Sequence, residues 1–357
     1  MKILHCVYSG LGGGISVVFS LIEGNNNKLI KNEILFSGPK IYRDIKKKAL
    51  NLNAKFDYIK TIKLLSFISY ISILKKIINR KPNVILLHNF LIIPCIFYKI
   101  FFPLTKIIYI NHTPINKFTY KDFIIRKLDL FINKFVCLNQ EAYIFYKKKL
   151  KLQSSKISCI TNGININFFS KSKFKKKKNF KIGMACRVNS FYKKYNLIAE
   201  SLLAKNIENL NINFSLAGNG EDLNNFKKKI KQLGLNKKIK LEGYLEEKKL
   251  KKWYNSLDLY IQASTGEGMS TSLLQAMSMK IPVIGSNVTG IKNILEKKKY
   301  LGLLFKNNIQ DLSKKIEYFY FVRKKIRNKY IKTQHDYVLK NHDCKLMFKK
   351  YLSLINS

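Results

Sequence analysis

Short apolar segments alternate with helix-like stretches along this chain, and that alternation constrains the fold more than any other feature. Short buried strands between helices are typical of a parallel sheet that helices cover on both faces. A turn rich in glycine, residues 10–14, follows the first segment and leads into a helical pattern at residues 15–22. The strands that we expect in the first half are residues 2–8, 84–87, 106–110, 135–138 and 157–160.

The same pattern starts again after a charged run without apolar periodicity, residues 171–180 (KSKFKKKKNF). We interpret this run as an interdomain linker, and a solvated loop inside one domain is the alternative. Beyond Leu312 the pattern is helical to the end of the chain, with a break expected near His335. The strands that we expect in this half are residues 181–184, 213–217, 239–242, 259–262 and 282–284.

Two such units predict an α/β protein of two doubly wound Rossmann-like domains that face a central cleft. The domains would comprise residues 1–170 and 171–335. Residues 336–357 would form a C-terminal helix that crosses back to the N-terminal domain. A chain of 357 residues is long enough for two domains that each bury a core.

The charge is strongly basic, with 67 Lys and Arg residues against 21 Asp and Glu and a formal net charge of +46. Such a surface attracts phosphates, nucleic acids and acidic lipids. A nucleic-acid-binding protein is therefore the main rival class. However, the basic residues are mostly Lys, which favours diffuse attraction over base reading, and no zinc finger, helix-turn-helix spacing or RNP-like aromatic set is visible. We expect no specific nucleic-acid partner.

Several features indicate a cytoplasmic protein. The six cysteines are widely spaced, without a CxxC or Cys/His cluster, so we expect reduced thiols and no zinc site. The N-terminus has no signal-peptide pattern. The most apolar stretch, residues 90–104, is interrupted by Pro94, Lys99 and Pro103 and is shorter than the roughly 20 residues of a membrane-spanning helix.

Residues 258–290 (DLYIQASTGEGMSTSLLQAMSMKIPVIGSNVTG) have the strongest chemical pattern. A strand leads into a loop of small residues with Gly266, Glu267 and Gly268, and a helical pattern follows. The unpaired N–H groups and positive dipole end of a helix start suit a diphosphate. Glu267 directly before that helix is either a ligand for sugar hydroxyls or an acid that caps the helix.

This segment resembles the retaining glycosyltransferases of family 4, which have the GT-B fold. The general pattern of that family is S-x-x-E-G-(F/M)-x-x-x-L-L-E-A-M-A-x-G-x-P-V-(I/V). One departure is Gln275, which replaces the second glutamate. The matching residues are Ser264, Glu267, Gly268, Met269, Leu273, Leu274, Ala276, Met277, Pro282, Val283 and Ile284.

Further matches follow in family order. Lys194 departs from the pattern, because it occupies the glycine position of the family's Lys-Gly pair and leaves the choice between Lys193 and Lys194 open. The matches are Gly12 to Gly14, Asn111 to Pro114 with His112, Thr161 to Gly163, Arg187, Lys193, Gly218, Gly220, Glu221 and Gly243. A single histidine such as His112 could equally be structural.

The resemblance implies hexosyl transfer from a nucleotide sugar, most simply a UDP-sugar, that is bound by the C-terminal domain. The acceptor would be a cell-envelope glycan, as in lipopolysaccharide or other polysaccharide biosynthesis, or a lipid-linked sugar on the N-terminal side. Arg187 and Lys193 would neutralise the leaving diphosphate, Glu267 would hold sugar hydroxyls, and His112 would orient the sugar. The resemblance implies no metal and no cofactor. The substrate-binding residues would be Gly13, Gly14, Gly243, Gly268, Met269, Ser270, Thr271 and, at the ribose, Gln275.

Two alternatives stay open for the activity, and one expectation concerns the membrane. An enzyme of the same fold, such as an epimerase or a phosphorylase, is possible, as is a non-catalytic relative, because Gln275 and Lys194 depart from the pattern. We also expect the N-terminal domain to dock peripherally on an anionic membrane face. This expectation of membrane docking rests on the lysines at positions 46–48, 75 and 76 and on the apolar residues 90–102. The alternative is that residues 90–102 form an ordinary buried helix.

Overall fold

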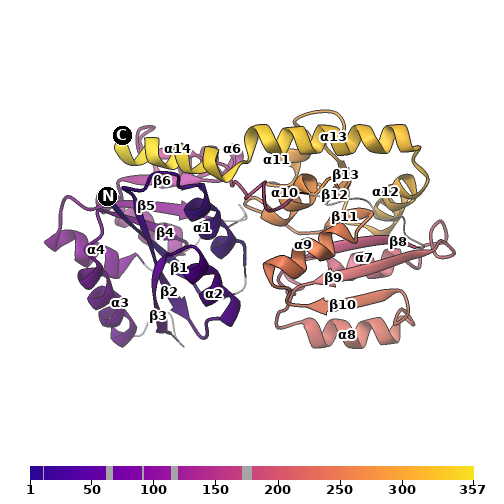
Figure 1. Ribbon diagram of the computed structural model, residues 1–357, viewed down its shortest axis with the longest axis horizontal. Helices are drawn as coiled ribbons and strands as arrows, with labels where there is room; N and C mark the ends of the chain where they lie inside the picture. Colours follow the sequence, from indigo (N-terminus) through magenta and orange to yellow (C-terminus); the bar gives the residue numbers. More distant parts are fainter. Residues whose placement is uncertain (11, 62–66, 91, 114–119, 171–178) are drawn as a thin grey trace. The chain divides into compact units, whose positions relative to one another are not determined.

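The computed structural model describes residues 1–10, 12–61, 67–90, 92–113, 120–170 and 179–357 (Figure 1). These residues form two compact units. The first unit contains residues 1–165 together with 343–357, and the second contains residues 166–342. The predicted linker at residues 171–180 falls mostly outside the described residues, and so does Pro114.

The first unit is built on a seven-stranded parallel sheet with the order β3-β2-β1-β4-β5-β6-β7. The five strands expected in this half are confirmed, and β2 and β3 are additional. The strands are β1 (Lys2–Tyr8), β2 (Lys31–Gly38), β3 (Lys55–Lys60), β4 (Val84–His88), β5 (Lys106–Asn111), β6 (Lys134–Cys137) and β7 (Ile157–Cys159).

Helices cover both faces of this sheet because successive strand residues point to opposite sides. In β2, Ile34 and Phe36 pack with the buried residues of α1 and α2, whereas Leu35 packs with those of α3 and α4. The C-terminal α14 packs against α1, and a Cβ atom at Gly24 would clash with the Cys344 carbonyl. The helices are α1 (Gly13–Gly24), α2 (Arg43–Asn51), α3 (Phe67–Arg80), α4 (Ile93–Phe101), α5 (Tyr120–Lys127), the 3-10 helix η1 (Asp129–Phe131), α6 (Gln140–Leu150) and α14 (Cys344–Asn356).

The second unit contains a six-stranded parallel sheet with the order β10-β9-β8-β11-β12-β13. The order reverses between β8 and β11, which is where doubly wound sheets bind ligands, beyond the carboxyl ends of the strands. The strands are β8 (Phe180–Ala185), β9 (Ile212–Ala217), β10 (Ile239–Gly243), β11 (Leu259–Gln262), β12 (Val283–Ser286) and β13 (Leu303–Phe305). The helices are α7 (Tyr195–Ser201), α8 (Leu223–Gln232), α9 (Glu247–Asn255), α10 (Thr271–Ser278), α11 (Lys292–Leu295), α12 (Ile309–Phe321) and α13 (Lys324–Asn341).

The break expected near His335 is wrong. Helix α13 runs through His335, and the helical tail is instead interrupted at residues 322–323 and at residues 342–343. Arg323 has an extended backbone that precedes α13. Asp343 is the N-cap of α14, and its carboxylate accepts a hydrogen bond from the Lys345 backbone N–H. The sequence analysis overlooked this capping aspartate.

Two further observations concern the expectations on compartment and membrane. All six cysteines lie in the described residues and are free thiols, as expected. In the described part of the chain, no helix has the length and apolarity needed to cross a bilayer.

Candidate functional site

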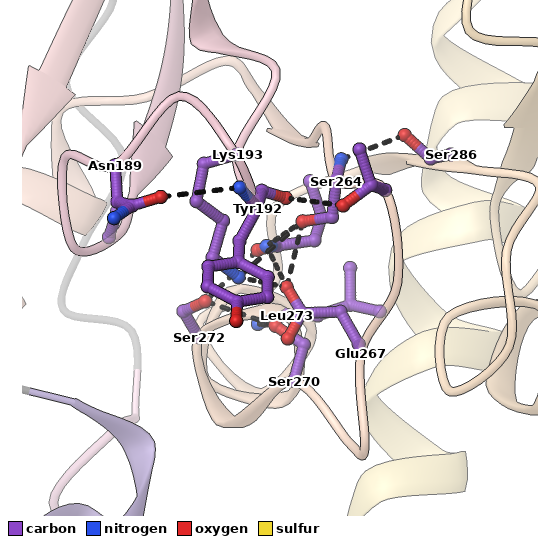
Figure 2. Close-up of polar contacts among 12 residues, drawn as sticks. Asn189, Tyr192, Lys193, Ser264, Glu267, Ser270, Ser272, Leu273 and Ser286 are labelled. Atoms are coloured by element: carbon purple, nitrogen blue, oxygen red, sulfur yellow. Dashed lines mark hydrogen bonds and ion pairs between the residues drawn. The ribbon is translucent and has the colours of Figure 1, made fainter. Parts of the chain in front are cut away.

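Two predicted donor-site residues of the second unit, Lys193 and Glu267, lie together at the strand-order reversal (Figure 2). The loop after β8, residues 186–194, carries Arg187 and Lys193. The loop after β11, residues 263–270, carries Glu267 and leads into α10. An isolated β-bridge between Lys193 and Ser264 joins the two loops. The strand topology therefore brings together residues that lie more than 70 positions apart in the sequence.

Glu267 is the centre of a polar cluster. Its carboxylate forms an ion pair with the Lys193 ammonium group and accepts hydrogen bonds from Ser264 Oγ at 2.8 Å and from Gln262 Nε2 at 2.9 Å. The Lys193 and Glu267 side chains are 17% and 14% exposed, so the pair is largely buried but reaches the surface. Glu267 is not the N-cap of α10. That position belongs to Ser270, whose Oγ accepts from the Leu273 N–H.

Gln262 supports this cluster through hydrogen bonds to Ser264 and Glu267. The sequence analysis did not single out Gln262. Its side chain is 1% exposed. Its Oε1 accepts from Tyr260 Oη at 2.8 Å and Ser272 Oγ at 3.0 Å, while its Nε2 donates to Ser264 Oγ and Glu267. These four bonds determine the orientation of the amide. A polar residue that ends an otherwise apolar strand was the available signal.

The structure distinguishes Lys193 from Lys194. The Lys193 side chain reaches Glu267, whereas the backbone N–H of Lys194 donates to the Ala263 carbonyl at 3.0 Å and Lys194 directly precedes α7. The backbone of Lys194 has φ −95°, which any residue can adopt. A lysine in the family's glycine position therefore costs no backbone strain here.

Arg187 lies on the same loop as Lys193 but bonds a different acid. Its guanidinium donates to Glu221 at 3.1 Å, and Asn189 Nδ2 donates to the same carboxylate at 2.6 Å. Both side chains of the Arg187–Glu221 pair are about half exposed. The pKa of Glu221 lies below its usual value because its own backbone N–H, Asn189 and Arg187 stabilise the charged form. Glu221 thus holds Arg187 at the surface. A bound anion would have to compete with Glu221 for the guanidinium group.

Gly290 shapes the loop that carries Glu267. Its φ of +83° is in the left-handed region, and a Cβ atom there would clash with the Glu267 carbonyl oxygen. The Glu267 N–H donates to the Thr289 carbonyl at 3.2 Å. The close approach of these two loops therefore requires glycine and sets the position of Glu267.

The remaining predicted donor-site residues of this unit lie on or beside α10 or at the end of β10. Gly268 and Met269 precede α10, and Thr271 is its first residue. Gln275, one turn further on, accepts a hydrogen bond at Oε1 from the Tyr254 hydroxyl at 3.1 Å. Gly243 ends β10 with φ +66°, and a Cβ atom there would meet no neighbour within 4 Å.

Gly13 and Gly14 begin α1 in the first unit. A Cβ atom at Gly14 would make only an ordinary contact with Val7, and one at Gly12 would meet nothing within 4 Å. The packing of the described residues therefore does not explain glycine at positions 12 and 14.

His112 follows β5 in the first unit and belongs to a row of three histidines. Its Nε2 lies 3.0 Å from Nδ1 of His88, which ends β4. Nε2 of His88 in turn lies 3.3 Å from Nδ1 of His5 in β1. Sequence analysis singled out His112 but neither of the other two, which lie within apolar strand segments.

Among the residues that the structure describes, no group of three or more His, Cys, Asp or Glu side chains is arranged to hold a metal ion. The absence of a metal requirement stays a prediction.

Comparison with known proteins shows which proteins this chain is similar to. Residues 165–335 match the family described as Glycosyl transferases group 1. The UDP-Gal:alpha-D-GlcNAc-diphosphoundecaprenol alpha-1,3-galactosyltransferase of Escherichia coli is 27% identical over 194 residues, which cover 49% of this chain and 48% of that protein. The O-antigen biosynthesis glycosyltransferase WclY of Escherichia coli is 27% identical over 166 residues, 44% of each chain. The chain spans about half the length of the curated relatives it matches or less.

Solved structures are similar over the whole chain. Anabaena Alr3699/HepE in complex with UDP and glucose has a TM-score of 0.80 at 14% identity, covering 100% of this chain and 99% of that one. A glycosyltransferase from Rickettsia africae has a TM-score of 0.80 at 17% identity, covering 99% and 97%. These likenesses confirm the predicted fold class, two Rossmann-like units of the GT-B kind.

Proposed function

We propose that this chain, which belongs to the glycosyl transferases group 1 family, is a retaining glycosyltransferase that uses a UDP-sugar and extends a cell-envelope glycan or lipid-linked acceptor. The observation that carries the proposal is the Lys193–Glu267 pair at the strand-order reversal, directly before α10. A cation, an acid and a helix N-terminus at one point match the two parts of a nucleotide sugar, its diphosphate and its hydroxyl groups.

The chemistry of transfer requires stabilisation of a leaving nucleoside diphosphate. Lys193, Arg187 and the first turn of α10 would supply positive potential at the departing phosphate oxygens. Without donor, Lys193 and Glu267 satisfy one another. A bound donor offers each a new partner, because the phosphate takes the ammonium group and the sugar hydroxyls take the carboxylate. The pair would thus keep both groups in place until the donor arrives.

The choice of UDP and of a hexose rests on relatives. Anabaena Alr3699/HepE is described in complex with UDP and glucose, and one Escherichia coli relative is named for UDP-Gal. Gly13 and Gly14 would let the backbone approach the donor, since packing does not explain a glycine at Gly14. Gly243 would lie near the base, Gln275 would bond the ribose, and Gly268, Met269, Ser270 and Thr271 would line the phosphates. His112 would orient a sugar.

A non-catalytic relative is the second candidate, favoured by Gln275 and Lys194. The unstrained backbone of Lys194 weakens one of these two arguments. The Lys193–Glu267 pair favours a chain that has kept its donor site, because desolvation of a partly buried ion pair is costly.

The acceptor is proposed to be membrane-anchored, because α3 and α4 expose a large apolar surface. The two helices pack against one another. Lys75 lies exposed on α3, and the net charge of the chain is +46, so this surface complements an acidic membrane. The residues of this α3–α4 apolar surface are Phe67, Ile68, Ile71, Ile78, Phe97, Ile100, Phe101, Phe102 and Leu104.

The structure revises which lysines belong to this surface. Lys46, Lys47 and Lys48 lie on α2, which packs on the opposite face of the sheet. Lys99 is directed to Asn133 Oδ1 at 2.6 Å, and burial lowers its pKa. Residues 90–102 also include a buried part, Pro94, Cys95, Ile96 and Tyr98, so the alternative of a buried helix holds for one side of α4 only.

Titration calorimetry with UDP, GDP and their sugars tests the proposed donor. We expect the wild-type chain to bind UDP with a dissociation constant between micromolar and millimolar. In a separate unfolding experiment, UDP at 100 times that constant should raise the free energy of unfolding by about 2.7 kcal/mol. A folded protein that binds no nucleoside diphosphate would contradict the proposal. Binding without turnover would favour the non-catalytic relative.

A further inference from the structure

Three of the five histidines of this chain form a continuous row across neighbouring strands. His5 lies in β1, His88 ends β4, and His112 follows β5. The rings are nearly parallel and meet edge to edge, with interplanar angles of 24° and 23° and centroid separations of 5.6 Å between His5 and His88 and 5.2 Å between His88 and His112. His5 and His88 are buried. At the inner end of the row, Asn32 Oδ1 in β2 lies 3.0 Å from Nε2 of His5.

Burial keeps the inner two histidines neutral. Burial lowers the pKa of His5 to about 4, which the hydrogen bond with Asn32 offsets only in part. The pKa of His88 lies well below its usual value because of burial and the proximity of His112 and His5. A neutral imidazole has one N–H donor and one acceptor nitrogen, so each ring can donate to one neighbour and accept from the other. Hydrogen bonds along the row must therefore all run in the same direction.

Asn32 determines that direction. Its Oδ1 accepts, so Nε2 of His5 carries the proton and Nδ1 of His5 is the acceptor. Nε2 of His88 then donates to His5, and Nδ1 of His88 accepts from Nε2 of His112. In this arrangement the proton of neutral His112 is on Nε2, and its basic nitrogen is Nδ1.

We propose that Asn32, His5 and His88 are positioning residues that fix the tautomer and ring orientation of His112, so that Nδ1 of His112 accepts a hydrogen bond from a hydroxyl of the sugar substrate. Second partners of a histidine commonly select its tautomer in this way. The assignment of a sugar hydroxyl rests on the proposed function. The tautomer itself does not, and it is a property of the protein without substrate.

Long-range ¹H–¹⁵N NMR spectra of the full chain with ¹⁵N-labelled histidine measure the tautomers directly. At pH 8 we expect His5, His88 and His112 all in the Nε2–H form. In His88→Leu, which removes the acceptor of the His112 Nε2–H group, we expect the fraction of His112 in the Nε2–H form to fall. An Nδ1–H form of His112 in the wild-type chain, or an unchanged single tautomer in a folded His88→Leu variant, would overturn the proposal. Neither result depends on transferase activity.

A kinetic arm separates positioning from mere stability. His88→Leu should lower kcat at least tenfold and leave UDP affinity within twofold, because Arg187 and Lys193, the proposed partners of the diphosphate, belong to the other unit. His88→Gln can still accept from His112 through Oε1 and donate to His5 through Nε2, so it should recover a large part of kcat. Equal kcat for His88→Leu and the wild-type chain would contradict the positioning role.

Asn32→Asp tests the direction of the row. A carboxylate next to His5 should raise its pKa from about 4 by roughly 1–3 units. Doubly protonated His5 must donate to His88 instead of accepting from it, which reverses the row. We expect near wild-type kcat at pH 8. Activity should then fall as the pH decreases through the raised pKa of His5, which lies between about 5 and 7. An unchanged pH profile would refute the proposed direction. If the wild-type chain transfers no sugar, the proposed function is contradicted, whereas the tautomers can still be tested by NMR.

Discussion

Lys193 and Glu267 form an ion pair between the loops that follow β8 and β11, at the point where the strand order of the second sheet reverses. The pair is supported on one side by Ser264 and Gln262. Such preorganisation keeps a cation and an acid in place for charge that develops during a reaction.

The first prediction concerns the cation. Lys193→Ala should weaken UDP binding about 10- to 100-fold, because it removes a charge-assisted contact of about 1.5–3 kcal/mol. Lys194→Ala is the matched control and should bind UDP within twofold of the wild-type chain. Calorimetric titration measures both. Equal losses in the two variants would mean that the choice of Lys193 is wrong.

The second prediction concerns the acid. Glu267→Gln should lower kcat about 10- to 100-fold while UDP affinity stays within threefold, since the carboxylate is proposed to hold the sugar and not the diphosphate. Gln262→Leu should lower kcat as well, because it removes one of the bonds that fix Glu267. Steady-state kinetics with the natural donor decide this. A variant with wild-type kcat would remove Glu267 from the mechanism.

A third prediction tests the ribose contact. Gln275→Glu should keep UDP affinity within about tenfold, because either side chain can accept from the Tyr254 hydroxyl and from ribose hydroxyls. Gln275→Leu, which can do neither, should bind UDP more weakly than Gln275→Glu. If Gln275→Glu abolishes binding, the amide N–H group is the part that contacts the nucleotide.

Much of this fold was predictable because buried parallel strands are apolar throughout. The strands β2 and β3 were overlooked. Lys31, Asn32 and Glu33 make the start of β2 polar, and β3 is a half-exposed edge strand. The break between α13 and α14 was misplaced because its signal is a single capping residue, Asp343.

The candidate site was only partly predictable. The resemblance pointed to Lys193 and Glu267, and the structure brings these two together. Gln262 was missed because its role comes from contacts with Ser272 and Glu267 across a turn, which no periodicity encodes. The row formed by His5, His88 and His112 depends on the strand order β1-β4-β5, which a linear pattern does not reveal.

The fourth prediction is that acid destabilises the chain through His5. The folded pKa of about 4 lies below the usual value of 6.5, so the unfolded state binds more protons between these values. Stability should therefore fall as the pH decreases from 6.5 to 4, by on the order of 3 kcal/mol for a shift of this size. Urea unfolding at pH 7.5 and pH 5 measures the change. In His5→Gln the difference should be smaller, and an unchanged difference would contradict the assignment to His5.

The fifth prediction concerns the α3–α4 apolar surface. Vesicles with acidic lipid should bind the wild-type chain at low salt, and binding should weaken as salt increases. Phe101→Asp should reduce co-sedimentation strongly, since the Phe101 side chain is 73% exposed on α4. Phe321→Asp is the control, because Phe321 is 64% exposed on α12 in the other unit. No binding to acidic vesicles, or equal loss in both variants, would favour a soluble acceptor.

Sugar transfer itself is the most direct test of the central claim. The wild-type chain is incubated with UDP-hexoses, a lipid-linked acceptor extract and a chelator, and both released UDP and sugar-extended acceptor are quantified by mass spectrometry. We predict equal amounts of the two products with the wild-type chain and a loss of at least 100-fold in the double variant Lys193→Ala, Glu267→Gln. Transfer by the double variant at the wild-type rate, or a folded wild-type chain that binds no UDP and releases none from any UDP-hexose, would contradict the account.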